Sequence, residues 1–318
     1  MPVSSSAFEW NMHQGYPTES LVRFLKARDG NVYKAHKMLI DCLTWRVENE
    51  IDKILTKPIV PTDLYRGVRD SQLLGLSGYS KGGLPVFAIG VGQSTFDKAL
   101  VHYYVQSHIQ INEYRDRVVL PHATKKCGRY IGTCLKVLDM TGLKLSALSH
   151  IKLLTVISTV DELNYPEKTD LNYNFIDEKH LFFKLKKYFI NFHQIVKPLL
   201  QERTRKKIQV LQGSGKEELL KVMDKESLPH FCRREGSSLR SNPSNCFSMD
   251  HAFHQQLYHY IKQQSMRSPT KQGPFHVTLP EPNSEEKYIA KTIEHEFHNF
   301  GKRNGLSHSF EGLEINVE

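Results

Sequence analysis

The sequence lacks the features that would place it in a membrane or send it out of the cell. It contains no run of about 18 apolar residues, which is close to the least that a bilayer-spanning helix needs. Residues 1–6 have neither a basic segment nor an apolar one, so we expect no secretory signal. The five cysteines are an odd number and lie scattered along the chain, at Cys42, Cys127, Cys134, Cys232 and Cys246. We therefore expect reduced thiols in the cytosol rather than a disulfide framework.

The sequence also lacks a complete enzyme motif. Gly213 to Lys216 hints at a phosphate loop, but its leading glycine is replaced by Val210 and Glu217 follows the lysine. Gly90 and Gly92 lack the third glycine of a dinucleotide loop. The absence of a reaction centre favours a binding protein, with no catalytic residue and no cofactor.

Histidines are the remaining candidates for a metal site. They have no cysteine or carboxylate set at a zinc-site spacing, so we expect surface histidines and no metal at His251, His254, His259, His295 and His298.

What the chain does have is a sizeable apolar fraction and an excess of positive charge. Of its 318 residues, 39% are hydrophobic and 10% aromatic, and the formal net charge is +9. A core of normal size is therefore available. The charge favours an anionic partner, either a membrane surface or a nucleic acid.

The N-terminal part reads as a helical hairpin. Thr18 and Glu19 can start a first helix, which Asp29 and Gly30 end, and Asn31 can cap a second helix over about 31–49. Asp63 can cap a short helix after that. In the first helix Leu21, Phe24 and Leu25 share a stripe, with Arg23, Lys26 and Arg28 largely outside it.

Strands and helices then alternate. Apolar runs predict strands near 73–76, 84–91, 132–140 and 208–211, and a less regular one over 171–176. Helical spacing predicts helices from Ser94 or Thr95 to about Val119, and over 146–164 and 216–223. This alternation is typical of an α/β unit with a mainly parallel sheet.

Two further regions are less ordered or more ambiguous. Residues 178–192 predict an amphipathic helix with four lysines mostly opposite its apolar face. Either it is a movable helix that touches a membrane, or it is an ordinary surface helix, which is the commoner case. After a linker at 236–243, helices are expected over about 249–264 and 285–300; they either pack on the domain or stay loosely attached.

The chemistry concentrates in residues 164–212. Glu167 stands beside Lys168 at one end, and the basic run 203–207 leads into an apolar strand at the other. A carboxylate accepts hydrogen bonds from hydroxyl groups and a lysine holds a phosphate. If the fold joins the two ends, they could hold a polyhydroxylated phosphate such as a phosphoinositide head group. A surface ion pair and a solvated basic run explain the same residues about equally well.

Four motifs in order resemble the CRAL-TRIO lipid-binding family, over about residues 17–235. They are 21–28 (LVRFLKAR), 137–143 (VLDMTGL), 164–167 (NYPE) and 196–200 (VKPLL). The similarity is strongest to the phosphatidylinositol/phosphatidylcholine transfer branch of "Sec-fourteen" type. The sequences of the motifs resemble those of a plant member. It implies a helical N-terminal lobe followed by an α/β domain with a mainly parallel sheet that encloses an apolar lipid pocket. It also implies a mobile gating helix and lipid exchange at membranes.

The resemblance assigns roles to individual residues. It implies that Glu167 receives the inositol head group with Lys168 as the adjacent cation, and that Lys207 binds the inositol phosphate with Thr204 on the same turn. We also expect Tyr104, Cys134 and Lys136 to line the pocket. Cys134 and Lys136 stand where phosphatidylcholine-binding relatives carry small hydroxyl residues, which argues against phosphatidylcholine as a second cargo.

The chain departs most from its relatives over residues 171–195, where they have a central apolar strand that leads into the gate. This segment is polar at alternate positions and longer, whereas buried parallel strands are nearly continuous apolar runs. It is either a divergent gate or a misjudged exon boundary that costs the sheet a strand. The expected organisation is a loose N-terminus at 1–16, a helical lobe at 17–62, a lipid-binding domain at 63–235, and a linker, two helices and a disordered tail at 236–318.

We therefore predict a lipid-binding and transfer protein that exchanges phosphatidylinositol between membranes. Its expected partners are the phospholipid cargo and, transiently, an anionic membrane surface, with no nucleic acid; it is expected to be a monomeric cytoplasmic protein, peripheral on membranes. The first alternative is a scaffold or regulator whose pocket is impaired by residues 171–195. The second is an enzyme that uses phosphate chemistry at 213–216, which the broken motif disfavours.

Overall fold

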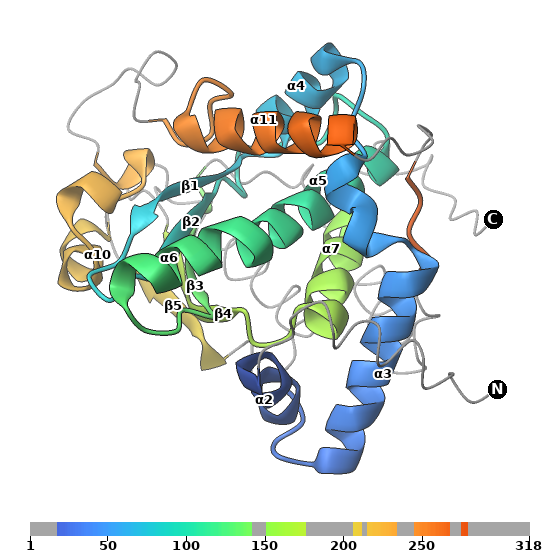
Figure 1. Cartoon of the computed structure of the whole chain (residues 1–318). Coiled ribbons are helices and arrows are strands. Elements are labelled where there is room, and N and C mark those ends of the chain that lie inside the picture. Colours follow the sequence, from blue (N-terminus) through green and yellow to red (C-terminus); the bar gives the residue numbers. More distant parts are fainter. Residues whose placement is uncertain are drawn as a thin grey trace, which may run out of the picture.

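The computed structural model describes residues 18–141, 151–175, 206–211, 215–233, 245–267 and 275–278. In these ranges a five-stranded sheet is covered by helices on both faces (Figure 1). The α/β class predicted from the sequence is confirmed. None of the helices described combines the length and the apolar character needed to cross a membrane.

The strands lie side by side in chain order. They are β1 (Leu74–Tyr79), β2 (Pro85–Ile89), β3 (Cys134–Asp139), β4 (Thr169–Phe175) and β5 (Ile208–Leu211). β1 and β2 form an antiparallel pair, and the other pairings are parallel. The irregular segment after Asp170 is thus a strand within the sheet, in which Tyr173 lies opposite Val137 on one side and Gln209 on the other.

The two faces of the sheet bury different apolar clusters, because successive strand residues point to opposite sides. Phe87 and Cys134 face the cluster formed with α5 (Val101–Tyr114), α7 (Ile151–Asn164) and α11 (Ala252–Arg267). Val86, Ala88, Leu135 and Val137 face the other cluster, which includes α10 (Lys216–Val222) and the segments around Phe231 and Phe247. Burial on both faces is the usual state of a parallel sheet.

The helical hairpin forms as predicted. α2 (Thr18–Lys26) and α3 (Val32–Glu48) are joined by a turn in which Asp29 and Gly30 have φ values of 52° and 77°. The Asn31 side chain caps α3 by accepting a hydrogen bond from the backbone nitrogen of Lys34 at 3.0 Å. A 3₁₀ helix, η1 (Ile51–Thr56), and α4 (Thr62–Ser71) then lead to the sheet.

Two predicted helix starts are wrong. The cap position of α4 is Pro61, so Asp63 lies inside the first turn and caps nothing. The next helix begins at Val101 and not at Ser94 or Thr95. The side chains of those two residues are used within the loop: Ser94 Oγ donates to Gly90 O at 2.8 Å, and Thr95 Oγ1 donates to Asp97 at 2.5 Å.

The same helix also runs further than predicted. After Tyr114 it passes through a π-type turn, η2 (Arg115–Val119), and continues as α6 (Leu120–Cys127). Pro121 stands in the first turn of α6, where a missing N–H is tolerated. The wider turn before it explains why the proline does not end the helix.

Of the two helices predicted beyond the linker, the first is described and packs on the domain. The Phe253 ring of α11 meets the Phe87 ring of β2 edge to face, at 5.9 Å between centroids. His254, predicted to be a surface residue, is fully buried and shares a hydrogen bond with Cys246 O at 3.0 Å. The predictions for residues 1–16, 178–195, 236–243, 285–300 and the C-terminal tail fall outside the described residues.

Candidate functional site

The turn between α7 and β4, residues 164–168, is the centre of the candidate site. Glu167 in this turn has a φ of 55°, a left-handed conformation that is uncommon for a residue with a side chain. Such a conformation costs about 1–3 kcal/mol and persists where the surroundings fix it.

Three backbone carbonyls of this turn are held by three other elements. Arg23 Nη1 of α2 donates to Pro166 O at 3.1 Å, and the backbone N of Cys134 in β3 donates to Lys168 O at 2.9 Å. Cys42 Sγ of α3 lies 3.6 Å from Asn164 O. Arg23 was predicted to lie largely outside the buried stripe of α2; it is buried, because its guanidinium reaches this turn.

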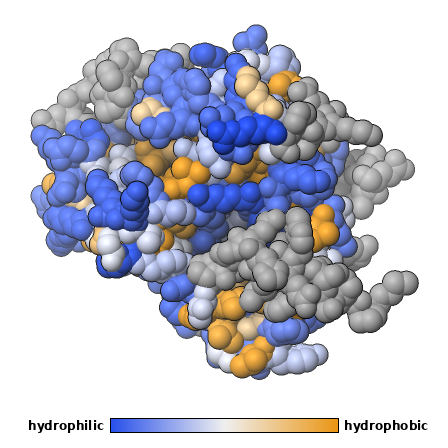
Figure 2. Space-filling view, viewed as in Figure 1, coloured by the Kyte–Doolittle hydropathy of each residue, from blue (hydrophilic) through white to orange (hydrophobic). Residues whose placement is uncertain are grey.

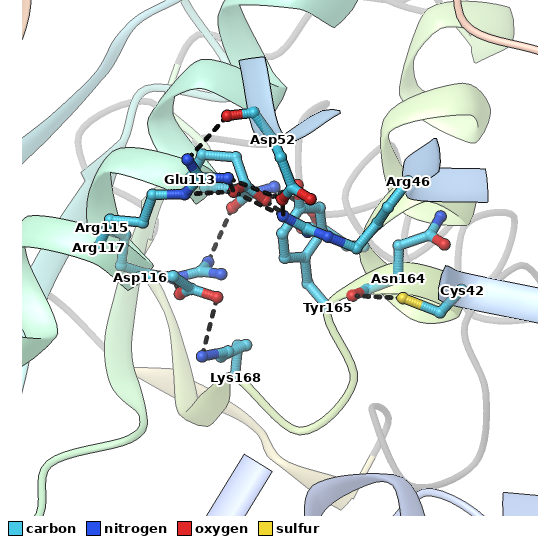
Figure 3. A network of polar contacts seen from close by, with 12 residues as sticks. Cys42, Arg46, Asp52, Glu113, Arg115, Asp116, Arg117, Asn164, Tyr165 and Lys168 are labelled. Carbon is cyan, nitrogen blue, oxygen red and sulfur yellow. Dashed lines mark hydrogen bonds and ion pairs between the residues drawn. The ribbon is translucent and has the colours of Figure 1, made fainter. Parts of the chain in front are cut away.

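Behind the turn, Tyr165 is anchored to a buried ionic network (Figure 3). Its hydroxyl donates to Glu113 Oε1 at 2.6 Å. Arg46 donates to the Glu113 carboxylate through Nη1 at 2.8 Å and Nη2 at 3.0 Å, and Arg117 Nε donates to the same carboxylate at 2.9 Å. Asp52 completes the network by accepting from both arginines.

The charges of this network decide the ionisation of Glu113. Burial alone would raise the pKa of this carboxyl group, but Arg46, Arg117 and the Tyr165 hydroxyl lower it to about 2. Glu113 is therefore an ionised carboxylate in the interior, and it holds Tyr165 in place.

A second ionic group lies on the other side of the turn. Asp116 receives Arg115 Nε at 2.8 Å, and its second oxygen lies 2.8 Å from Lys168 Nζ. Burial opposes ionisation of Asp116, but Arg115, Lys168 and Arg23 hold its pKa far below the usual range. Burial also lowers the pKa of Lys168 to about 8, against the attraction of Asp116. Three cations thus lie around the carboxylate of Asp116.

The ion pair between Glu167 and Lys207 joins the two ends of residues 164–212, the segment in which the sequence concentrates its chemistry. Lys207 Nζ lies 2.5 Å from Glu167 Oε2 and donates to Thr169 O at 3.0 Å. The side chain of Lys207 remains 26% exposed and that of Glu167 15% exposed. A joint site at Glu167 and Lys207 requires these ends to meet, and the parallel pairing of β4 with β5 brings them together. Thr204, predicted on the same turn as Lys207, lies outside the described residues.

The residues predicted to line a pocket lie in different places. Cys134 is fully buried, and Lys136 Nζ, on the same face of β3, lies 3.4 Å from Asp161 Oδ2 of α7. Tyr104 is packed between α4 and the loop before α5, where its hydroxyl meets Ser71 Oγ at 2.7 Å and accepts from the backbone N of Lys98 at 2.9 Å. Lining a pocket stays a prediction for all three.

Asp161 makes the surroundings of Lys136 polar. It lies 2.7 Å from His108 Nε2 and accepts from Asn112 Nδ2 at 2.8 Å, both on α5. Burial opposes ionisation, but His108 and Lys136 hold the pKa of Asp161 far below its usual range. The face of β3 that carries Cys134 and Lys136 thus holds a lysine whose charge is balanced by the partly buried carboxylate of Asp161.

Sequence reasoning missed the buried network, although two signals were present. Arg46 falls on the apolar stripe of α3, and Glu113 lies one turn after the buried Ile109 in α5. Charged residues in such positions are seldom buried unless they are paired. No group of three or more His, Cys, Asp or Glu side chains within the described ranges is arranged to hold a metal ion.

Comparison with known proteins gives matches to two family models and to longer curated proteins. Residues 69–232 match the model of the CRAL/TRIO domain, and residues 3–41 match that of the CRAL/TRIO N-terminal domain. The CRAL-TRIO domain-containing protein T23G5.2 of Caenorhabditis elegans is 29% identical over 235 residues, covering 70% of this chain and 30% of its own. The phosphatidylinositol/phosphatidylcholine transfer protein SFH9 of Arabidopsis thaliana is 28% identical over 242 residues, covering 72% and 40%.

The matched region is a part of these longer relatives, since it spans well under half of their length. Among solved structures, the crystal structure of Sfh5 aligns with a TM-score of 0.48 and 18% identity, over 87% of this chain and 80% of that one.

Proposed function

The chain belongs to the CRAL/TRIO family, and from that premise we propose that it binds a phospholipid and exchanges it between membranes without catalysing a reaction. The Arabidopsis relatives SFH9 and SFH7 bear the name of phosphatidylinositol/phosphatidylcholine transfer proteins. Moving the acyl chains from water into an apolar interior is favourable by about 0.8 kcal/mol per buried CH₂ group. A carrier of this kind therefore needs an apolar interior.

The observation that carries the proposal is the contact between Glu167 and Lys207. In the absence of cargo the two charges neutralise each other. A phosphoinositide offers each of them a better partner, because the inositol hydroxyls can donate to the carboxylate and the phosphate can accept from the ammonium. The partial exposure of both side chains leaves them within reach of such a head group.

The surrounding charges support an anionic head group. Arg23, Arg115 and Lys168 all lie close enough to Asp116 to lower its pKa, so three cations gather beside the turn. A phosphate placed beside the turn would be attracted by these cations. We propose phosphatidylinositol as the cargo, with Thr204 completing the head-group site.

Phosphatidylcholine fits the described residues less well. Its quaternary ammonium carries a positive charge and cannot donate a hydrogen bond. Lys136 on the inner face of β3 would repel this group, and Asp161 is already surrounded by His108, Asn112 and Lys136. A carrier with this strand should therefore prefer the inositol lipid.

The test is to extract the lipid from purified protein, to weigh the intact complex by native mass spectrometry, and to measure phosphatidylinositol transfer between vesicles. Glu167→Gln and Lys207→Gln remove one charge each. The loss of a charge-assisted hydrogen bond of about 1.5–3 kcal/mol predicts that transfer falls by about tenfold or more. Lys221→Gln is the matched control, because Lys221 forms an exposed pair with Glu218 on α10.

Transfer that is unchanged in both site variants would contradict the head-group assignment. A folded wild-type protein that carries no lipid and transfers none would instead favour the alternative of a scaffold. The position of β4 inside the sheet speaks against a lost strand as the cause of such a result.

A further inference from the structure

The tip of the helical hairpin exposes apolar side chains that nothing in the described structure covers. Tyr33 is 80% and Val32 71% exposed, more than any other large hydrophobic residue that the structure describes. Val22 on the facing helix is 38% exposed, and Leu25 is partly buried beside it. Figure 2 shows hydrophobic surface gathered at this end of the molecule, over α2 and the start of α3. We call residues 22–34 the hairpin tip.

Packing does not require apolar residues at these positions. Val32 and Tyr33 are the first two residues of α3, and the inward-facing positions that follow are Ala35 and Met38. The turn is fixed without them, by the Asn31 cap and by the bond from Gly30 N to Leu25 O at 2.9 Å. Polar residues would serve equally well at an exposed helix start, so the apolar pair calls for a partner.

The charges around this pair indicate which partner. The hairpin tip contains four cationic residues, Arg23, Lys26, Arg28 and Lys34, and one acidic residue, Asp29. Lys26 and Lys34 are exposed next to the apolar surface. Exposed apolar side chains with two exposed lysines nearby match the interface of an anionic leaflet, where the apolar side chains enter the head-group layer and the ammonium groups meet lipid phosphates.

The position of the tip relative to the turn at residues 164–168, the proposed head-group site, also fits an anionic leaflet as the partner. Arg23, which follows Val22 in α2, donates to Pro166 O in the turn that carries Glu167. The hairpin tip therefore lies at the same end of the molecule as residues 164–168 (Figure 1). A lipid leaving the site would meet a leaflet on which the tip rests.

We propose that the hairpin tip is a membrane-docking element that inserts Val32 and Tyr33 into an anionic leaflet. This inference rests on the proposed function, because it names the surface through which the exchange takes place.

The chain offers a matched control for the apolar pair. Leu100 and Val101, at the start of α5, are 68% and 55% exposed. They lie beside α4, since the Lys98 side chain near them packs against Gly67. Lys98 there is paired with Asp97 at 3.2 Å, so the surface lacks the excess of cations found at the tip.

The experiment measures binding of the full chain to sedimenting vesicles of phosphatidylcholine, with and without phosphatidylserine. Removing the apolar pair by Val32→Ser with Tyr33→Ser should lower the partition coefficient by about tenfold or more. Lys26→Gln with Lys34→Gln should lower it on the phosphatidylserine vesicles alone, by about fivefold for each charge, and added salt should mimic that loss. The control, Leu100→Ser with Val101→Ser, should bind as the wild type does.

A gain-of-signal variant tests insertion directly. Tyr33→Trp should bind at least as well as the wild type, since tryptophan favours the membrane interface, and its emission should shift to shorter wavelength when vesicles are added. Emission that stays unshifted while the protein binds would show that another surface docks.

Other outcomes would overturn the proposal. Wild-type binding by the Val32→Ser/Tyr33→Ser variant, or an equal loss in the Leu100→Ser/Val101→Ser control, would exclude the tip as the docking element. If the tip variant instead turns a dimer into a monomer in sedimentation equilibrium without changing vesicle binding, the partner of the tip is a second copy of the chain.

Extraction of lipid from the same preparations separates this inference from the proposed function. A tip variant that carries as much lipid as the wild type yet binds vesicles weakly supports docking alone. A wild-type protein that carries no lipid, but still docks through the tip, would refute the cargo and keep the docking element.

Discussion

Replacing Glu113 by glutamine tests whether the turn at residues 164–168 rests on an ionised carboxylate. The glutamine would keep the shape of the side chain and an acceptor for the Tyr165 hydroxyl. Its amide NH₂, however, would face the guanidinium of Arg46, which now binds a carboxylate through two nitrogens. Removing one partner of a buried ion pair costs about 3–5 kcal/mol. We expect the lower end of that range, because Asp52 still pairs with Arg46 and Arg117.

The pKa of Glu113 gives the same magnitude by an independent route. Its folded-state value of about 2 lies below the ordinary value of 4.5, and one unit corresponds to about 1.4 kcal/mol. The depressed pKa therefore contributes about 3 kcal/mol of stability. For a carboxyl group with a lowered pKa this contribution is present above the unfolded value and is lost as the pH falls towards the folded value. Wild-type protein should thus lose about 2 kcal/mol from this group between about pH 6 and about pH 3.

The assay is denaturant unfolding of the wild type and the Glu113→Gln variant across this pH range, followed by tryptophan fluorescence, to which Trp45, buried in α3, contributes. The gap in unfolding free energy should be about 3 kcal/mol near neutral pH and should shrink towards acid. Other carboxyl groups titrate in both proteins and cancel in the difference. Glu218→Gln, in an exposed pair on α10, should stay within about 1 kcal/mol of wild type. Parallel curves for Glu113→Gln and wild type would show that folding does not lower the pKa of Glu113.

Two further predictions concern buried groups. Because the folded protein binds the Lys168 proton with a pKa of about 8, below the ordinary 10.5, stability should rise relative to Lys168→Met as the pH increases from about 8 to about 10; a constant difference in unfolding free energy would contradict this. Cys127 is exposed and the other four cysteines are buried, so a thiol reagent should add one adduct to the native protein and five after unfolding. Rapid native labelling of Cys134, seen by peptide mapping, would show that solvent and reagent reach the face of the sheet on which Cys134 lies.

Local signals predicted much of the scaffold. The hairpin was foreseen from helical spacing, from Gly30 and from Asn31, because a turn and a cap depend on residues close in sequence. β3 and β5 were foreseen from short apolar runs for the same reason. The start of α5 was missed because Ser94 and Thr95, which are good caps, make their bonds inside the preceding loop.

In the candidate site, too, features set by nearby residues were predicted and features set by distant segments were missed. Glu167 and Lys207 were singled out by residue type, but their contact depends on the pairing of two strands about 40 residues apart. The network behind them was not predicted, since its partners come from distant segments: Arg46 and Glu113 are 67 residues apart. His254 was misjudged although a signal existed, because its spacing to Leu257 and Ile261 places it on the buried face of α11.

The left-handed conformation of Glu167 links this buried network to the proposed head-group site. A strain of about 1–3 kcal/mol is matched by the hydrogen bonds that hold Pro166 O and Lys168 O, each worth about 0.5–1.5 kcal/mol net, and by the charged contact of Lys168 with Asp116. The carboxylate of Glu167 is thus in position before a ligand arrives, so that binding need not order the turn, which lowers the entropy cost of recognition. One of these bonds comes from Arg23 on α2, the helix that also carries Val22 of the hairpin tip. The turn proposed to receive the head group and the surface proposed to meet the leaflet are therefore linked through α2. Replacing Arg23 should accordingly reduce lipid transfer, whereas replacing Glu167 should have less effect on docking.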